Sequence, residues 1–427
     1  MDMLKTVKQA IKVPEMRAKI LFTVMMLVIF CVGSHIPVPG IDRTQLANMF
    51  KNQGGLFDLF DLFSGGSFSN FTIFALSITP YVTASIIVQL LTVAFPYFER
   101  LAKEGNEGRK KMAAITRYMT VGLALIQAFG LTIGLFRRAV VNQTWFSFVV
   151  ITLVLTAGTA FLMWLGEQIN ENGIGNGISI LIFAGIVARI PSDVRSIALQ
   201  YKEGAINIIT LILFIAFALL VVVGVIFIQQ GTRRIPVQYA KRVVGRKMYG
   251  GQSTHIPLKV NQAGVIPVIF AVSLLQFPLT ITYFLKSNSG FTAFVTKWLS
   301  PSGNPGVWVY AIFNIILIIA FNYFYTTISF NPIEVAQNMK SNGGFIPGIR
   351  PGKATIEYLA KVMGRISIVG ALFLAVIATL PTLISQYTGL NIRFGGTSLL
   401  IVVGVAIDVM RQLENQMVMR NYKGFLK

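Results

Sequence analysis

The sequence predicts an all-α polytopic membrane protein: ten transmembrane helices in two pseudo-symmetric inverted halves, with one short extra helix that does not cross the bilayer. Three observations lead to this fold class. The chain has 427 residues, of which 54% are hydrophobic and only 12% are charged, whereas soluble domains are about a quarter charged. Apolar runs recur near the length of about 20 residues that a helix needs to cross a bilayer. Successive loops also alternate between rich and poor in lysine and arginine.

Each apolar run is expected to be helical, because backbone groups in hydrocarbon must find their hydrogen-bond partners within the segment. The fifth run is the shortest. We place the spans at residues 20–36, 71–95, 112–136, 145–165, 178–190, 205–228, 263–285, 307–330, 366–384 and 394–410.

The basic residues orient these spans. Loops on the side of the N-terminus carry 27 of the 37 Lys and Arg residues, and loops on the other side carry 10. Cytoplasmic loops are enriched in Lys and Arg, so we predict that both termini are cytoplasmic. The first 19 residues are charged and lack a small-residue cleavage site, so the first span is expected to remain in the mature protein.

Ten spans divide into two halves of five, and an odd-numbered half repeated in tandem is inverted relative to the first. Inverted repeats around a central path are common in transport proteins. The predicted divisions are a cytoplasmic N-terminal segment, an N-terminal half, a C-terminal half with two large cytoplasmic loops, and a cytoplasmic tail: residues 1–19, 20–204, 205–410 (loops 229–262 and 331–365) and 411–427.

The spans contain few charges. Glu167 and Arg189 fall at helix ends, and Asp408 lies near the cytoplasmic end of the last span. Ion and proton paths usually carry a carboxylate inside the membrane. This pattern argues against an ion-coupled carrier, although a sodium site built from carbonyls stays open.

The sequence also lacks the residue patterns that enzymes usually need for catalysis. The only histidines, His35 and His255, are predicted on opposite sides of the membrane, and the single cysteine, Cys31, has no partner for a disulfide or a metal site. The stretch "PGIRPGKAT" lacks the first glycine of a phosphate-binding loop, and Ala354 replaces its Ser or Thr. We therefore predict no enzyme activity and no cofactor, and any energy would come from outside the chain.

Aliphatic side chains dominate the spans instead. Ile78 and Val82 are four residues apart, as are Ile178 and Ile182, so each pair shares a helix face. These residues could simply face lipid or pack between helices. Periodicity alone does not decide between that interpretation and a functional one.

The stretch "LFDLFDLFSGGSFSN" precedes the second span and is too short to cross a bilayer. Leu56, Leu59, Phe60 and Phe63 would form one apolar face of a helix. Gly65 and Gly66 follow as a hinge. A helix lying in the membrane interface is the alternative; it explains the length and the apolar face of the stretch but not the glycine hinge.

Two long basic loops separate the later spans. The first alternates apolar and polar residues in "RIPVQYAKRVV", which predicts a hairpin that projects from the membrane. Its basic cluster, which includes Arg246 and Lys247, either orients the protein on anionic lipid or docks a large partner, for which ribosomal RNA is one candidate. The second loop has an ordered, non-helical tip rich in Gly and Pro, and Arg350 lies on it.

Several long stretches resemble the SecY/Sec61-alpha family, the channel subunits of the Sec protein translocase, in family order over essentially the whole chain. They are "LFSGGSFSNFTIFALSITPYVTASIIVQLL", "GIGNGISILIFAGIVARIP", "YAKRVVGRKMYGGQSTHIPLKVNQAGVIPVIFA", "FNPIEVAQNMKSNGGFIPGIRPGKAT" and "FGGTSLLIVVGVAIDVM".

The resemblance implies an hourglass pore that is closed at mid-membrane by a ring of aliphatic side chains, with a plug helix at residues 56–67 and a lateral gate between spans two and three and spans seven and eight. By motif, the ring maps to Ile78, Val82, Ile178, Ile182, Ile269 and Ile401. Thr83, Gln89 and Gln127 are polar candidates for the gate.

The resemblance also implies a function and partners. Such a channel passes unfolded secretory polypeptides across the bacterial plasma membrane and releases apolar segments sideways into lipid. It works with the SecE and SecG subunits and with the motor SecA or a ribosome, and it does not bind DNA. Arg350 resembles the arginine that the motor needs, and Arg246 and Lys247 resemble the tip that meets the ribosome. The rival interpretations are a secondary transporter or lipid flippase, which would need a polar pocket at mid-membrane, and a purely structural membrane protein.

Overall fold

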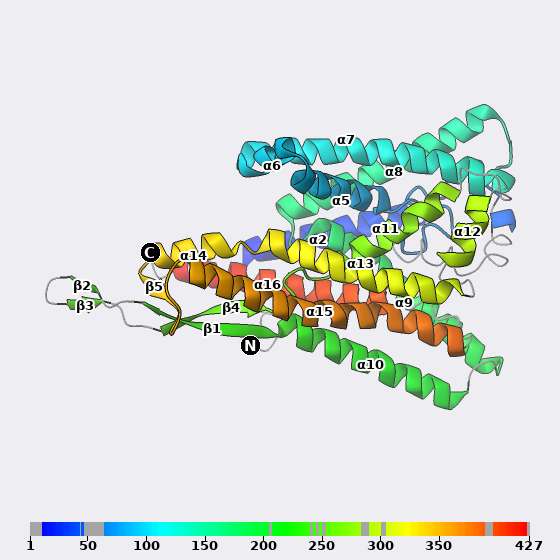
Figure 1. Cartoon of the computed structure of the whole chain (residues 1–427). Coiled ribbons are helices and arrows are strands. Elements are labelled where there is room, and N and C mark those ends of the chain that lie inside the picture. Colours follow the sequence, from blue (N-terminus) through cyan, green and yellow to red (C-terminus); the bar gives the residue numbers. More distant parts are fainter. Residues whose placement is uncertain are drawn as a thin grey trace.

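Long apolar helices run back and forth between two ends of the molecule in the computed structural model (Figure 1). The structure describes residues 11–42, 44–46, 64–204, 207–239, 242–244, 247–249, 253–282, 290–299, 305–388 and 396–424. The long helices are α2 (Pro14–Gly33), α5 (Thr79–Ala94), α7 (Asn106–Gly130), α8 (Trp145–Asn172), α9 (Gly177–Lys202), α10 (Ile208–Gln230), α11 (Ile266–Thr282), α13 (Gly306–Ser329), α15 (Lys353–Thr388) and α16 (Gly396–Gly424).

Each of the ten predicted spans coincides with one of these helices. Within the described residues, eight helices are long and apolar enough to cross a membrane. A ninth span arises if α5 is joined to α6 (Pro96–Lys103), to which it is bent by 101°. The remaining helix, α11, is apolar but has only 17 residues. The predicted fold class is confirmed at this level: a multi-pass, all-helical membrane protein.

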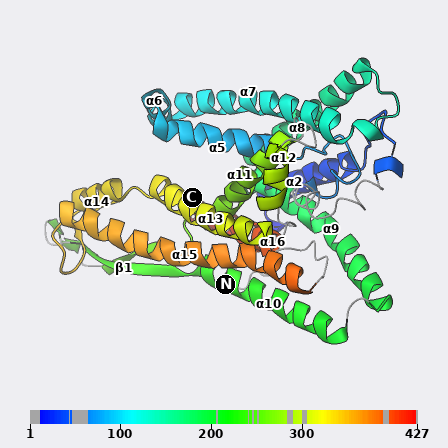
Figure 2. The ribbon, with the colours of Figure 1, turned by 45° about the vertical axis from the view of Figure 1, so that its right-hand side comes forward.

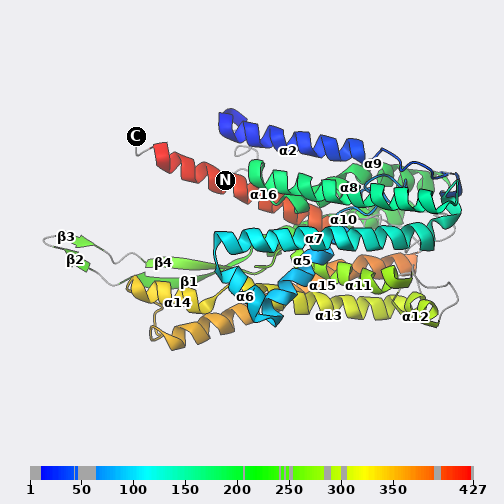
Figure 3. The ribbon, with the colours of Figure 1, turned by 90° about the horizontal axis from the view of Figure 1, so that it is seen from above.

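The helices form two groups. Figure 2 shows α5, α7 and α8 on one side, α10, α13 and α15 on the other, and α11 between them. The elements that connect the long helices also show which end of the molecule carries the large loops. The helices α6 and α14 (Pro332–Ser341), the strands and the C-terminus all lie at one end in Figures 1 and 3, and the start of α2 points the same way in Figure 3. We call this the basic end, since the predicted Lys- and Arg-rich segments lie there.

The second predicted span is only partly helical, which corrects its predicted start at residue 71. Residues 71–78 form turns, with left-handed backbone at Phe71 and Ser77 (φ 46° and 53°). This irregular backbone is buried in protein: the Ile73 N–H donates to the Ile36 carbonyl at 3.0 Å. A Cβ on Gly158 of α8 would lie 2.0 Å from the Ile73 oxygen, so a glycine at this position lets the turns pack directly on α8. Irregular segments are tolerated at membrane depth where protein covers them.

The fifth span is longer than predicted. Instead of ending at residue 190, α9 continues through Pro191 to Lys202. The polar sequence after Pro191 resembles a loop, but one helix continues through it. At its start, the Asn176 side chain accepts hydrogen bonds from the N–H groups of Ile178 and Ser179, which is the usual arrangement at a helix N-terminus.

The predicted hairpin is confirmed and is joined by a strand from the second loop. Strand β1 (Thr232–Tyr239) pairs antiparallel with β4 (Ser253–Lys259), and the short strands β2 (Arg242–Val244) and β3 (Lys247–Tyr249) pair with each other. Strand β5 (Gly344–Phe345) adds to the other edge of β1. A hydrophobic core lies between this sheet, α14 and the start of α15. Helix α15 begins at Lys353 rather than at residue 366. Because β5 pairs with β1 and α14 and α15 share a core with the sheet, the two basic loops form one folded unit, which we call the protrusion.

The shorter elements connect the long helices. The π-turn η1 (Leu131–Leu135) and the 3-10 turn η2 (Arg137–Ala139) end α7, and α12 (Gly290–Trp298) precedes α13 at the end opposite the protrusion (Figure 1).

Candidate channel and its seal

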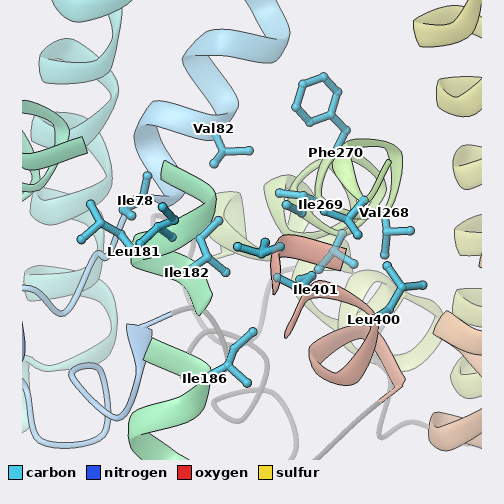
Figure 4. Close-up of a cluster of buried hydrophobic side chains, with 14 of the residues drawn as sticks. Ile78, Val82, Leu181, Ile182, Ile186, Val268, Ile269, Phe270, Leu400 and Ile401 are labelled. Carbon is cyan, nitrogen blue, oxygen red and sulfur yellow. The ribbon is translucent and has the colours of Figure 1, made fainter. Parts of the chain in front are cut away.

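Five of the six predicted ring residues come together in one buried cluster where four helices meet (Figure 4). Ile78 lies immediately before α5, Val82 on α5, Ile182 on α9, Ile269 on α11 and Ile401 on α16. All five have 7% or less of their surface exposed. We call these five residues the aliphatic cluster. They come from both predicted halves of the chain, so residues separated by more than 300 positions meet in one cluster.

The sixth predicted residue, Ile178, is only partly buried and packs against the edge of this cluster. A Cβ on Gly166 of α8 would lie 3.3 Å from the Cγ1 atom of Ile178, so this side chain lies against α8. In this structure Ile178 is therefore at the periphery, and the other five residues occupy the centre.

The four helices that carry the aliphatic cluster have no charged residue close to it. Helices α5 and α11 contain no charged residue at all. The first charge on α9 is Arg189 and the first on α16 is Asp408, each seven residues after its cluster isoleucine, or about 10 Å along the helix. An ion pair between Arg117 and Glu167 (2.7 Å) instead joins α7 to α8.

The predicted plug falls mainly outside the described residues, which begin again at Ser64. Leu56, Leu59, Phe60 and Phe63 are in that undescribed part. Residues 64–70, which we call the tether turn, pack beside the aliphatic cluster. Gly65 and Gly66 both have left-handed backbone (φ 64° and 88°). A Cβ on Gly65 would lie 2.7 Å from the Cα of Gly185, which is three residues beyond Ile182 on α9. The predicted hinge is therefore a turn that is held against α9 here.

Replacing Gly65 with alanine is expected to open the resting channel to ions. The new methyl group would collide with the Gly185 backbone and push the tether turn off α9. Gly66→Ala is the matched control, because it brings the same left-handed strain but has no heavy atom within 4 Å of its Cβ position. We predict an increase of about tenfold in ion flux through vesicles with Gly65→Ala, and little change with Gly66→Ala, since a dry apolar constriction blocks ions only while it is closed. Equal flux in the two variants would show that this contact plays no part in sealing.

Of the three predicted gate residues, Gln127 lines a cleft between α5 and α7 on one side and α11 on the other. It is buried on α7 and faces a small cleft together with Thr79 at the start of α5 and Thr280 of α11. Thr83 bonds within its own helix, with its hydroxyl donating to the Thr79 carbonyl at 3.0 Å. Gln89 is half-buried on α5. Sequence reasoning missed Thr280, because span seven also contains Ser273, Gln276 and Thr282 and the sequence does not single out one of these polar residues.

On the α11 side of this cleft, α11 packs on α13 through aromatic contacts. The Phe270 ring meets the Phe321 ring edge-on, with centroids 5.8 Å apart. These contacts hold α11 and α13 together as one wall, opposite the wall formed by α5 and α7.

Two of the three predicted docking residues, Lys247 and Arg350, lie on the protrusion. Arg246 is outside the described residues, and Lys247 begins β3. Arg350 is exposed on the turn that follows β5. The Thr355 hydroxyl donates to the Arg350 carbonyl at 2.9 Å, and Gly348 and Gly352 on either side have left-handed backbone. The tip is therefore a defined turn that presents Arg350 to solvent.

The SecY family profile matches residues 72–410. A protein translocase subunit SecY from Halalkalibacterium halodurans is 49% identical over 436 residues, which cover all of both chains. The chain belongs to the SecY family.

Solved structures of similar fold superpose on this chain over most of its length. A structure described as a protein conducting channel superposes with a TM-score of 0.70 and 22% identity, covering 94% of this chain and 93% of that one. Sec61 in the canine ribosome-channel complex from the endoplasmic reticulum superposes with a TM-score of 0.64 and 20% identity, covering 94% and 93%. At these identities the likeness concerns the fold of the SecY family.

Proposed function

We propose that this chain is a protein-conducting channel of the bacterial plasma membrane, with both termini and the protrusion in the cytoplasm. The aliphatic cluster carries the proposal. It joins residues of both predicted halves of the chain, about 10 Å along α9 and α16 from the first charged residues of those helices. A narrow aliphatic constriction excludes water and so blocks ions. It also lacks fixed charges and hydrogen-bonding groups, so it would not select among the side chains of a passing polypeptide.

Sideways release of apolar segments is proposed at the seam between the α5–α7 wall and the α11–α13 wall. Gln127, Thr79 and Thr280 line the cleft at this seam. Separation of the two walls would expose a passing segment to lipid, and segments that are apolar enough would partition there.

The driving force is proposed to come from outside the chain. The protrusion offers a folded, basic surface at one end of the channel, and family membership favours SecA or a ribosome as the partner that docks there. The canine relative named above is part of a complex with a ribosome. SecE and SecG are the proposed membrane partners, and the chain itself is proposed to transport rather than to catalyse.

A secondary transporter is the rival function. It would place polar or charged ligands for its substrate near mid-membrane. The observation that favours the channel is that the point where α5, α9, α11 and α16 meet is occupied by Ile78, Val82, Ile182, Ile269 and Ile401.

A polypeptide arrested halfway through the channel tests the proposal. A photoreactive residue at Ile182 or Ile401 should crosslink to the arrested chain when motor and ATP are supplied, because both side chains would line its path. The same residue at Ile212 of α10, which has 60% of its surface exposed, is the control and should crosslink to lipid only. Crosslinks at Ile212 and none at Ile182 or Ile401 would refute the proposed path.

A further inference from the structure

The protrusion is attached to the membrane helices through a short connection. Strands β1 and β4 pair as far as Thr232 and Lys259, and the pairing continues one step further, because the Val260 N–H donates to the Gly231 carbonyl at 2.9 Å. Gly231 directly follows α10, and α11 begins at Ile266. The two long strands of the protrusion therefore lead directly into two membrane helices. We call this connection, residues 229–231 and 259–265, the base.

The base rests on the backbone of α16 at a glycine. A Cβ on Gly404 would lie 2.5 Å from the Cγ1 atom of Val265 and 3.1 Å from the Nε2 atom of Gln229. Gln229 lies in the last turn of α10, and Val265 lies immediately before α11. Both sides of the base therefore meet α16 at one position, where a side chain larger than that of glycine would push them away.

This contact lies next to the aliphatic cluster. Gly404 is three residues after Ile401 on α16, so the two share a helix face. Val265 is four residues before Ile269, and the Ile269 N–H donates to the Val265 carbonyl at 3.3 Å. Val265 also belongs to the same buried core as both isoleucines. A shift of the base on Gly404 would therefore act within one helical turn, or about 5 Å, of two residues of the cluster.

A second contact holds the base on α16 nearer the basic end. The Arg411 guanidinium donates to the Gln229 carbonyl at 2.6 Å, across 182 positions of the chain. The last four carbonyls of a helix lack partners within the helix, and a cation is favourable at that end. Asp408, one turn earlier on α16, interacts electrostatically with the same arginine. Arg411 therefore fastens the end of α10 to α16.

Two buried amide side chains in the base are only partly used. Gln229 has 3% of its surface exposed and Asn261 has 4%. Asn261 donates to the Gly264 carbonyl at 2.9 Å. Among the residues that the structure describes, however, neither the Asn261 Oδ1 atom nor the Gln229 Nε2 atom has a hydrogen-bond partner. Buried amide groups are normally paired, so the base holds one unused acceptor and one unused donor.

We propose that the base and α16 form a joint that carries a movement of the protrusion to the aliphatic cluster. When a partner docks, the base shifts on Gly404 to a second position, in which its unused donor and acceptor gain partners and Ile269 and Ile401 separate. Arg411 makes the ends of α10 and α16 move together. Gly404 and Arg411 are positioning residues, since they act through the isoleucines rather than on the passing polypeptide. This role rests on the proposed function of the chain and of the protrusion.

Removal of the Arg411 side chain tests the joint without changing the docking tip. In vesicles that contain the full chain, Arg411→Ala should bind the motor with wild-type affinity. It should take up an unfolded secretory polypeptide about tenfold more slowly, the effect expected for one hydrogen bond to a charged group. Arg411→Lys keeps a cationic donor and should recover most of the uptake. Wild-type uptake by Arg411→Ala, or a loss of motor binding that accounts for the slower uptake, would overturn the joint.

An added methyl group at Gly404 gives a second test that needs neither motor nor polypeptide. Gly404→Ala would displace Val265 and Gln229 next to the cluster and should raise the ion conductance of the resting protein about tenfold, because a wetted constriction conducts. Gly364→Ala, on α15, is the matched control: no heavy atom lies within 4 Å of its Cβ position, and conductance should not change. Equal conductance in the two variants would also overturn the joint.

The two tests separate the joint from the function on which it rests. A wild-type protein that takes up no polypeptide when motor and ATP are supplied would contradict the proposed function. A wild type that transports normally, together with an Arg411→Ala variant that transports equally well, would contradict the joint alone.

Discussion

Reversing the charge of Arg350 is expected to reduce motor-driven export to less than about a tenth of wild type, because like charges placed opposite each other at an interface cost several kcal/mol. Arg350 is exposed on a turn that is fixed by the Thr355 hydrogen bond and by two glycines with left-handed backbone. A charge on a defined tip is presented in one orientation, so a docking partner can recognise it. The measurement is ATP-dependent uptake of an unfolded secretory polypeptide into vesicles that contain Arg350→Glu.

The variant should still insert into the membrane at normal levels, since Arg350 lies outside the spans and its side chain is exposed. Lys340→Glu is the matched control: it changes charge by the same amount on the same protrusion, at an exposed position of α14, and should keep most of the uptake. If Arg350→Glu imports the polypeptide at the wild-type rate, the proposed docking role of Arg350 is wrong.

Much of the fold could be predicted because a bilayer imposes strong rules on sequence. Apolar runs marked all ten long helices, and the Lys and Arg bias placed the basic loops at one end, where the protrusion and the C-terminus lie. The errors occurred where tertiary contacts override local patterns. Residues 71–78 are apolar enough for a helix, yet they form turns that pack on Gly158. The start of α15 at Lys353 is polar and resembles a loop, but the core beneath the sheet makes it helical.

The candidate site was less accessible to sequence reasoning. Spacing showed that Ile78 and Val82 share a helix face, but only the family resemblance connected them with Ile269 and Ile401. The structure brings these four residues and Ile182 together and leaves Ile178 at the edge. The contact of Gly65 with Gly185 joins residues 120 positions apart, so no local pattern predicts it. Thr280 was missed for the same reason: its role depends on which helix lies across the seam.

Replacing Ile78, Ile182 and Ile401 together with serine is expected to make the resting channel leak ions. These three residues come from different helices and meet in the aliphatic cluster. Hydroxyl groups there would let water stay in the constriction, and a wetted constriction conducts where a dry one does not. The matched control replaces Ile212, Ile312 and Ile316, which are exposed on the outer faces of α10 and α13, and changes the same number of isoleucines without touching the cluster.

Conductance of the resting protein in a planar bilayer, without motor or substrate, tests the aliphatic seal most directly. Our account predicts almost no current for the wild type and for the control variant, and a current at least about tenfold higher for the cluster variant, as expected when a dewetted gate becomes wet. A cluster variant that inserts normally and stays as tight as the wild type would contradict the claim that these isoleucines close the channel.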